Sequence, residues 1–144
     1  MKKIGLVVLS VLMVLLVSGC GAKTQKLSCK TQVEGVDITF NVGFKGNMIE
    51  TMDFNYFYDL SKYTDAQVES IEKQDFCQTI KDSMPDYKDG FKSCEDHVNK
   101  ESKTLTVDSV LDVDKIAKNT LDKMGTIESC KETLEAQGYT CTVQ

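Results

Sequence analysis

The sequence contains no arginine and no tryptophan, and it has a single proline, Pro85, and a single histidine, His97, among its 144 residues. It also has no internal repeat and no low-complexity run. These absences exclude a repeat array and a disordered linker as the main organisation. Once the apolar N-terminus is set aside, the remaining length suits one domain with one core.

The familiar catalytic motifs are absent as well. There is no GxSxG, HExxH or CxxC sequence and no glycine-rich phosphate loop. His97 is the one side chain of ordinary imidazole basicity, and no pair of carboxylates stands out as an acid and its base. We therefore name no catalytic residue and favour a non-enzymatic role, with an enzymatic one as the open alternative.

The charge balance excludes one class of partner. All 17 basic residues are lysines, and 22 acidic residues outnumber them, which gives a net charge of −5. An acidic surface repels the phosphates of nucleic acids. We expect no nucleic-acid partner.

A lysine pair and an apolar run open the sequence. Lys2 and Lys3 precede the run 4–17, which ends in Leu16-Val17-Ser18-Gly19-Cys20. A charged start, a short apolar stretch and small residues before a cysteine are typical of a bacterial lipoprotein signal. We expect cleavage before Cys20 and a diacylglyceryl lipid on its thiol. The alternatives are a membrane-spanning helix, which needs about 20 apolar residues, and an ordinary signal peptide that leaves Cys20 unmodified.

Lipidation of Cys20 predicts where the protein works. Residues 1–19 would be removed, residues 20–26 would form a short tether, and residues 27–144 would form a single domain. Two acyl chains give stable anchoring, so the domain is expected on the outer face of the cell membrane. We expect no cofactor besides this covalent lipid.

The tether is short and carries two lysines. The six residues 21–26 that follow Cys20 span at most about 20 Å, which keeps the domain close to the bilayer. Lys23 and Lys26 would then face anionic headgroups; the alternative is that they belong to a solvated spacer.

Apolar periodicity predicts an α+β fold in the order β-β-β-α-β-β-α-α-β. Strands are expected at 27–33, 36–44, 48–58, 91–98, 104–111 and 139–143. Helices are expected at 64–84, with a capping box at Thr64 and Gln67, then from Asp112 or Asp114 to Gly125, and from Thr126 to Gly138. Such an order is typical of an antiparallel sheet with helices packed on one face.

Five cysteines follow Cys20, and outside the membrane thiols oxidise. Two bonds among five cysteines allow about 15 pairings. Cys77 lies in the long helix and Cys94 in the strand that follows a short loop, so the two can meet when the helix packs back. Cys29 and Cys141 lie in the first and last strands. We expect the disulfides Cys77–Cys94 and Cys29–Cys141.

Cys130 is then left unpaired. It shares the apolar face of its helix with Ile127 and Leu134, so a buried thiol that acts as a small hydrophobic side chain is one interpretation. A reactive or intermolecular thiol is the other.

Two groups of residues resemble metal ligands only loosely. Cys94 lies three residues before His97, and on a strand such positions face opposite sides. Asp108, Asp112 and Asp114 lack the spacing of a calcium loop. We expect no metal site.

Aromatic residues crowd the end of the third strand and the loop after it, at Tyr56, Phe57, Tyr58 and Tyr63. Phe57 should point away from Tyr56 and Tyr58. The cluster is either covered on one side by the helix 64–84 and solvated on the other, or it is a binding patch.

Three segments, together with the Cys20 motif, resemble the small YehR-like lipoproteins of Gram-positive bacteria: Leu27-Ser28-Cys29, Gln74-Asp75-Phe76-Cys77 and Leu134-Glu135-Ala136-Gln137-Gly138-Tyr139-Thr140-Cys141. The resemblance covers the mature chain and implies the same α+β order. Cysteines 29, 77, 94 and 141 resemble its recurring set, whereas Cys130 departs from it. The use of lysine in place of arginine, common in AT-rich genomes, favours a similar source. The resemblance implies no activity and no catalytic residue.

Two hypotheses about function remain open, besides a purely structural role. The first is a non-enzymatic module that binds an envelope protein, a peptide or a glycan near the membrane. The second is a thiol-dependent redox or other enzymatic lipoprotein that uses Cys130, with His97 as its base.

Overall fold

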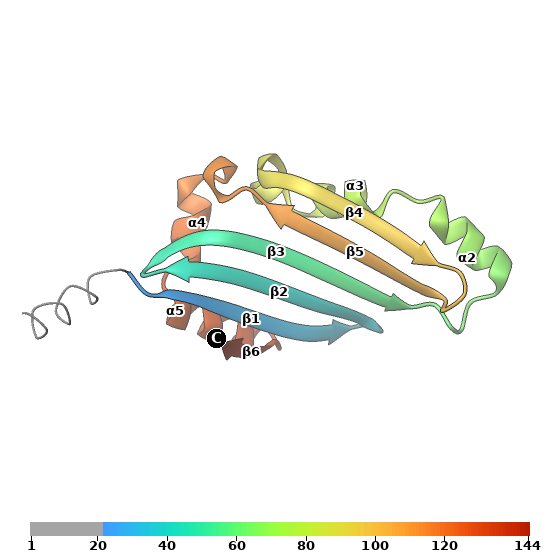
Figure 1. Ribbon diagram of the computed structural model, residues 1–144, viewed down its shortest axis with the longest axis horizontal. Helices are drawn as coiled ribbons and strands as arrows, with labels where there is room; N and C mark the ends of the chain where they lie inside the picture. Colours follow the sequence, from blue (N-terminus) through green and yellow to red (C-terminus); the bar gives the residue numbers. More distant parts are fainter. Residues whose placement is uncertain (1–21) are drawn as a thin grey trace, which may run out of the picture.

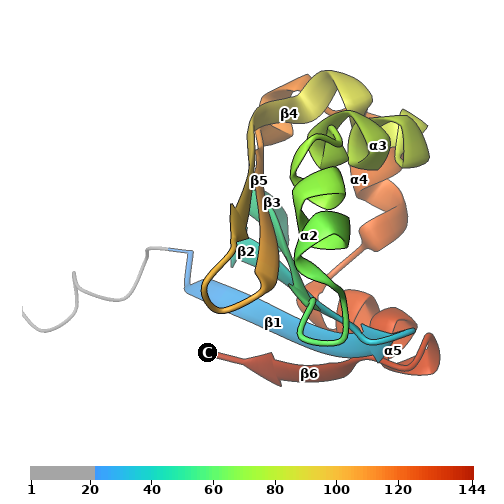
Figure 2. The same cartoon turned by 90° about the vertical axis from the view of Figure 1, so that its right-hand side faces the viewer.

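The computed structural model describes residues 22–144, so Cys20 and the predicted signal sequence lie outside the described residues. The fold is α+β, as predicted. One antiparallel sheet of six strands has the order β4-β5-β3-β2-β1-β6, and the helices lie on one of its faces (Figures 1 and 2). The elements are β1 (Thr24–Val33), β2 (Val36–Lys45), β3 (Met48–Asp59), α2 (Asp65–Glu72), α3 (Phe76–Ser83), η1 (Pro85–Gly90), β4 (Phe91–Asn99), β5 (Thr104–Leu111), η2 (Val113–Lys115), α4 (Lys118–Met124), α5 (Ile127–Ala136) and β6 (Thr140–Val143).

Strands β1, β2 and β3 form the predicted meander. Alternate side chains of β2 face the helices, and Phe40, Val42 and Phe44 are buried there. The β1–β2 turn contains Glu34 and Gly35, both with positive φ, a conformation that glycine adopts without steric cost. Local alternation and turn chemistry therefore account for this half of the sheet.

The first strand begins earlier than predicted. β1 starts at Thr24 and not at residue 27, because residues 24–26 pair with Lys45, Phe44 and Gly43 of β2. Lys26 also exchanges two backbone hydrogen bonds with Gln144, at 3.0 and 2.8 Å. The expected tether 20–26 is thus shortened, since its last three residues belong to the sheet. Pairing with the C-terminal strand was invisible in the local pattern.

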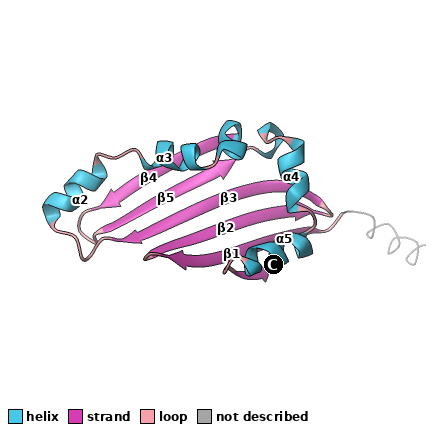
Figure 3. Ribbon diagram, turned by 180° about the vertical axis from the view of Figure 1, so that it is seen from behind, coloured by secondary structure: helices cyan, strands magenta, loops and turns pink. Residues whose placement is uncertain are grey.

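The long helix predicted at 64–84 is two helices. The capping box at Thr64 is present and starts α2, as predicted. α2 ends at Glu72, and Asp75 caps a second helix by accepting a hydrogen bond from the Gln78 N–H at 2.7 Å. An aspartate inside a helix competes with the backbone in this way. The break lets α3 lie along β4 independently of α2 (Figure 3).

The sheet order depends on two long connections, one from β3 to β4 and one from β5 to β6. β5 returns to lie between β4 and β3, and β6 pairs with β1 at the opposite edge. Figure 3 shows α2 and α3 over the β4–β5 side and α5 over the β1–β2 side, with α4 between them. The core is accordingly split into two clusters, one around Phe44 and Leu27 and one around Leu105 and Val68.

Within residues 22–144, no helix combines the length and the hydropathy needed to cross a bilayer.

Candidate functional site

The aromatic residues predicted as a binding patch do not share one surface. Tyr56 and Tyr58 face the helices and pack on the cluster around Leu105. Phe57 pairs across strands with Thr106 and therefore lies on the helix-free face. Tyr63 is exposed in the loop after β3. Strand alternation therefore divides these four residues, an arrangement that agrees with the alternative in which helices cover one side of the cluster.

The two inward tyrosines behave as core residues. Burial raises the pKa of Tyr56 and of Tyr58 above the ordinary value. The Tyr58 ring lies 6.2 Å from the ring of Phe76, the first residue of α3. Their contribution is to hold α3 against the sheet.

A different hollow opens on the helical face, between η1, α4 and α5. It has a volume of about 260 Å³. Its apolar part comes from Phe40, Tyr87, Met124, Cys130 and Leu134, and its polar part from Asp86, Thr120, Lys123, Thr133 and Gln137. We call this the η1–α5 hollow. An apolar recess edged by a few polar groups is the usual form of a binding site for part of a ligand.

Phe40 is held rigidly within this hollow. It is buried, and its ring stacks on that of Phe54 with centroids 4.4 Å apart and an interplanar angle of 10°. Because β2 and β3 are hydrogen-bonded neighbours, Phe40 and Phe54 are directly opposite across the strands. The stacked pair fixes the hollow before any ligand binds.

Cys130 forms no disulfide and is buried, with 2% of its surface exposed. Burial raises its pKa, so the thiol stays protonated at neutral pH. The nearby Tyr87 phenol also has a raised pKa, first through burial and then through repulsion by Asp86 and Cys130. A protonated thiol beside a neutral phenol is a poor nucleophile.

His97 does not approach Cys130. His97 pairs with Thr106 on the edge strand β4 and lies on the helix-free face, whereas Cys130 lies among core residues on the helical face. The thiol–imidazole pair that the redox hypothesis required is not assembled.

Both predicted disulfides are present. Cys29 and Cys141 are directly opposite across β1 and β6, with Cα atoms 4.1 Å apart, and both are buried. The Cys77–Cys94 bond ties α3 to β4, with Cα atoms 5.7 Å apart, and is only partly buried. The first bond closes the sheet at one edge, and the second holds a helix at the other.

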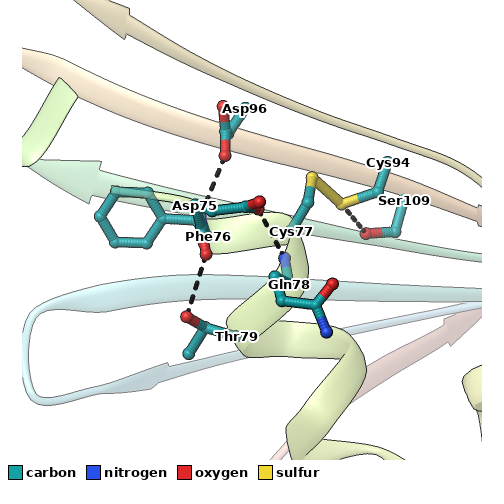
Figure 4. The surroundings of a disulfide bond; sticks show 8 residues. All are labelled: Asp75, Phe76, Cys77, Gln78, Thr79, Cys94, Asp96 and Ser109. Atoms are coloured by element: carbon teal, nitrogen blue, oxygen red, sulfur yellow. Dashed lines mark hydrogen bonds between the residues drawn. A yellow bond between two sulfur atoms is a disulfide. The ribbon is translucent and has the colours of Figure 1, made fainter. Parts of the chain in front are cut away.

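Figure 4 shows how the Cys77–Cys94 bond is supported. The Phe76 N–H donates to Asp96 Oδ2 at 3.1 Å, so β4 binds the start of α3 beside the disulfide. On the other side, the Ser109 hydroxyl donates to Cys94 Sγ at 3.4 Å. Asp75 and Asp96 surround the start of α3 with carboxylates, an arrangement that stabilises a helix N-terminus.

The residues that loosely resemble metal ligands in the sequence have structural roles. Cys94 is in a disulfide. Asp108 accepts a hydrogen bond from Asn55 at 2.6 Å, and Asp112 caps η2 and pairs with Lys115 at 3.6 Å. In the part of the chain that the structure describes, no three potential ligands converge.

Sequence reasoning missed the η1–α5 hollow. Tyr87 belongs to a short turn after Pro85, where the pattern predicts only the end of a helix. Phe40 and Leu134 look like ordinary core positions of a strand and a helix. No local pattern indicates that these three would surround one recess.

Comparison with known proteins supports the fold alone. A protein from Streptococcus pneumoniae TIGR4, with a structure determined by NMR, is similar with a TM-score of 0.52 and 14% sequence identity, over 83% of this chain and 84% of that chain. No family model matches the sequence. No curated protein matches it either.

Proposed function

We propose that this chain is a lipid-anchored protein of the outer face of the cell membrane that binds a partner without catalysing a reaction. The observation that carries the binding part is the η1–α5 hollow, an apolar recess on a rigid aromatic base. The anchoring part rests on the motif Leu16-Val17-Ser18-Gly19-Cys20.

Two features support a location outside the cytoplasm. The two disulfides suit an oxidising compartment. The described domain begins at Ala22, so few residues separate it from Cys20. The resemblance to YehR-like lipoproteins agrees with this location and stays a prediction.

The chemistry of the hollow favours a peptide ligand. A recess of about 260 Å³ accommodates one side chain of moderate size and not a whole small molecule. Phe40, Met124 and Leu134 offer it apolar contacts, and Lys123 and Asp86 offer opposite charges at the edge for a peptide backbone or its flanking residues. We infer that the ligand is a peptide segment of an envelope protein that presents one apolar side chain.

The binding proposal can be tested by photo-crosslinking in living cells. A photoreactive amino acid at Gln137, at the edge of the hollow, should give a discrete adduct, and one at Thr39 on the helix-free face should not. Thr133→Trp should fill the hollow and abolish the Gln137 adduct. Glu132→Trp, on the adjacent exposed position of α5, is the matched control and should leave it intact.

Two results would contradict this proposal. One is an adduct that Thr133→Trp and Glu132→Trp affect equally. The other is an adduct released by glycosidases and unchanged by proteases, which would identify a glycan.

The anchoring proposal has its own test. Cells fed radiolabelled palmitate should incorporate label into the wild-type chain, and Cys20→Ala should abolish it. An unlabelled wild-type protein, or one recovered with residues 1–19 still attached, would contradict lipidation of Cys20.

A further inference from the structure

We propose that the β2–β3 turn is a second membrane contact, placed beside the lipid so that Met48 enters the interface of an anionic bilayer. This inference rests on the proposed lipidation of Cys20. It also predicts the orientation of the domain: the end of the sheet with the β2–β3 turn faces the membrane, and the strands run away from the bilayer.

The turn is fixed to the start of the described chain. The Gly46 N–H donates to the Lys23 carbonyl oxygen at 3.0 Å, and Lys45 pairs across strands with Thr24. A Cβ atom placed on Gly46 would lie 3.6 Å from Ala22 Cβ. Figure 1 shows this turn beside the beginning of β1. Wherever residue 22 is held, the turn is held with it.

The remaining length of chain is too short to separate the turn from the bilayer. Two residues beyond Ala22 reach Cys20, a distance of at most about 7 Å. The headgroup layer of each leaflet is itself about 5–7 Å thick. With its acyl chains in the bilayer, Cys20 therefore brings the turn to headgroup depth.

The tip of the turn presents an apolar side chain to solvent. Met48 is 67% exposed, more than any other large hydrophobic residue of the described chain, and it directly follows Gly46-Asn47. A flexible thioether side chain inserts readily among lipid chains. An exposed methionine at this one position is unfavourable in water and favourable in an interface.

The charges around Met48 suit anionic headgroups. Lys23 and Lys26 have no ion-pair partner among residues 22–144, and Lys45 has only an exposed contact of 3.8 Å with Glu50. Lysines can extend their ammonium groups to phosphates while their methylene chains lie against apolar surface. Acids also lie at this end: Asp112 is paired with Lys115 and Asp122 with Lys118, whereas Asp114 has no ion-pair partner among residues 22–144.

The absence of tryptophan makes a direct test available. Met48→Trp in the mature lipidated protein provides a single tryptophan at the tip. Val33→Trp is the matched control, because Val33 is 52% exposed in the other turn of β1, about 30 Å along the strand. Asn47→Trp is a second reporter in the same turn. Each variant is reconstituted into vesicles of phosphatidylcholine and phosphatidylglycerol with brominated acyl chains.

The expected result is quenching and a blue shift of the Met48→Trp and Asn47→Trp emission, with the Val33→Trp emission unchanged. Quenching should weaken when phosphatidylglycerol is omitted. If the protein floats with the vesicles but neither turn reporter is quenched, the contact is overturned while the anchor stands. A blue shift without quenching identifies a protein partner on the turn and also overturns it. A protein that does not float overturns the anchor and the contact together.

Discussion

The Cys29–Cys141 disulfide is the bond whose removal tests the fold most sharply. It joins residues 112 apart in sequence, whereas Cys77–Cys94 joins residues 17 apart. Closing the longer loop restricts the unfolded chain more, and the loop-entropy relation gives about 4.8 kcal/mol of stabilisation against about 3.2 kcal/mol for the shorter. Removing the first bond should therefore cost about 1.5 kcal/mol more.

Burial of Cys29 and Cys141 increases the expected difference in stability loss between removing the two disulfides. Cys29 and Cys141 are 0% and 7% exposed, so replacing both by alanine also removes buried sulfur atoms from the core. β6 has only four residues and pairs with β1 alone. Without the disulfide, we expect β6 to open first.

The assay compares Cys29→Ala/Cys141→Ala with Cys77→Ala/Cys94→Ala by urea unfolding and by thermal melts. The first double variant should lower Tm by roughly 15–20 °C and the second by roughly 10–15 °C. Hydrogen exchange should accelerate in β6 for the first variant and in α3 for the second. If the second variant loses as much stability as the first, loop entropy does not govern these bonds and the reasoning fails.

Further predictions concern Cys130 and the cap of α2. Because burial raises the pKa of Cys130, the folded chain retains a proton that the unfolded chain loses above about pH 8.5. The free energy of unfolding should fall as pH rises past this value, and Cys130→Ala should flatten that part of the profile; an unchanged profile would contradict it. Iodoacetamide should label native Cys130 at least about 10³-fold more slowly than in urea if access needs unfolding, so rapid labelling would show an open thiol. Thr64→Ala should cost about 1 kcal/mol in urea unfolding, since it removes the capping box, whereas exposed Ser70→Ala on the same helix should cost nothing.

Local patterns predicted much of the fold. The alternation of β2 put Phe40, Val42 and Phe44 on one face, and the structure buries all three. The Thr64–Gln67 capping box marked the start of α2 correctly. Both features depend on residues a few positions apart, so the sequence pattern contains them.

The candidate site was predicted poorly. Alternation already separated Phe57 from Tyr56, and a helix covering one side of the cluster was one of the two arrangements expected. The pattern could not decide between that cover and a binding patch, because the packing of Tyr56 and Tyr58 beside Phe76 is a tertiary contact. The break at Asp75 was hidden because apolar spacing continues through it. Asp75 caps the new helix, and the hydrogen bond from Phe76 N–H to Asp96 on β4 adds a tertiary contact at the same point.

The sequence by itself determined which face each side chain takes and where hairpins turn, because these depend on the periods of strands and helices and on short loops. Only the tertiary structure decided what lies opposite each face. β5 returns beside β3, β6 closes on β1, and η1 packs near α5 so that Tyr87, Phe40 and Cys130 surround one hollow. Such contacts join residues far apart in the chain, and their stability comes from the whole packed core and not from any local segment.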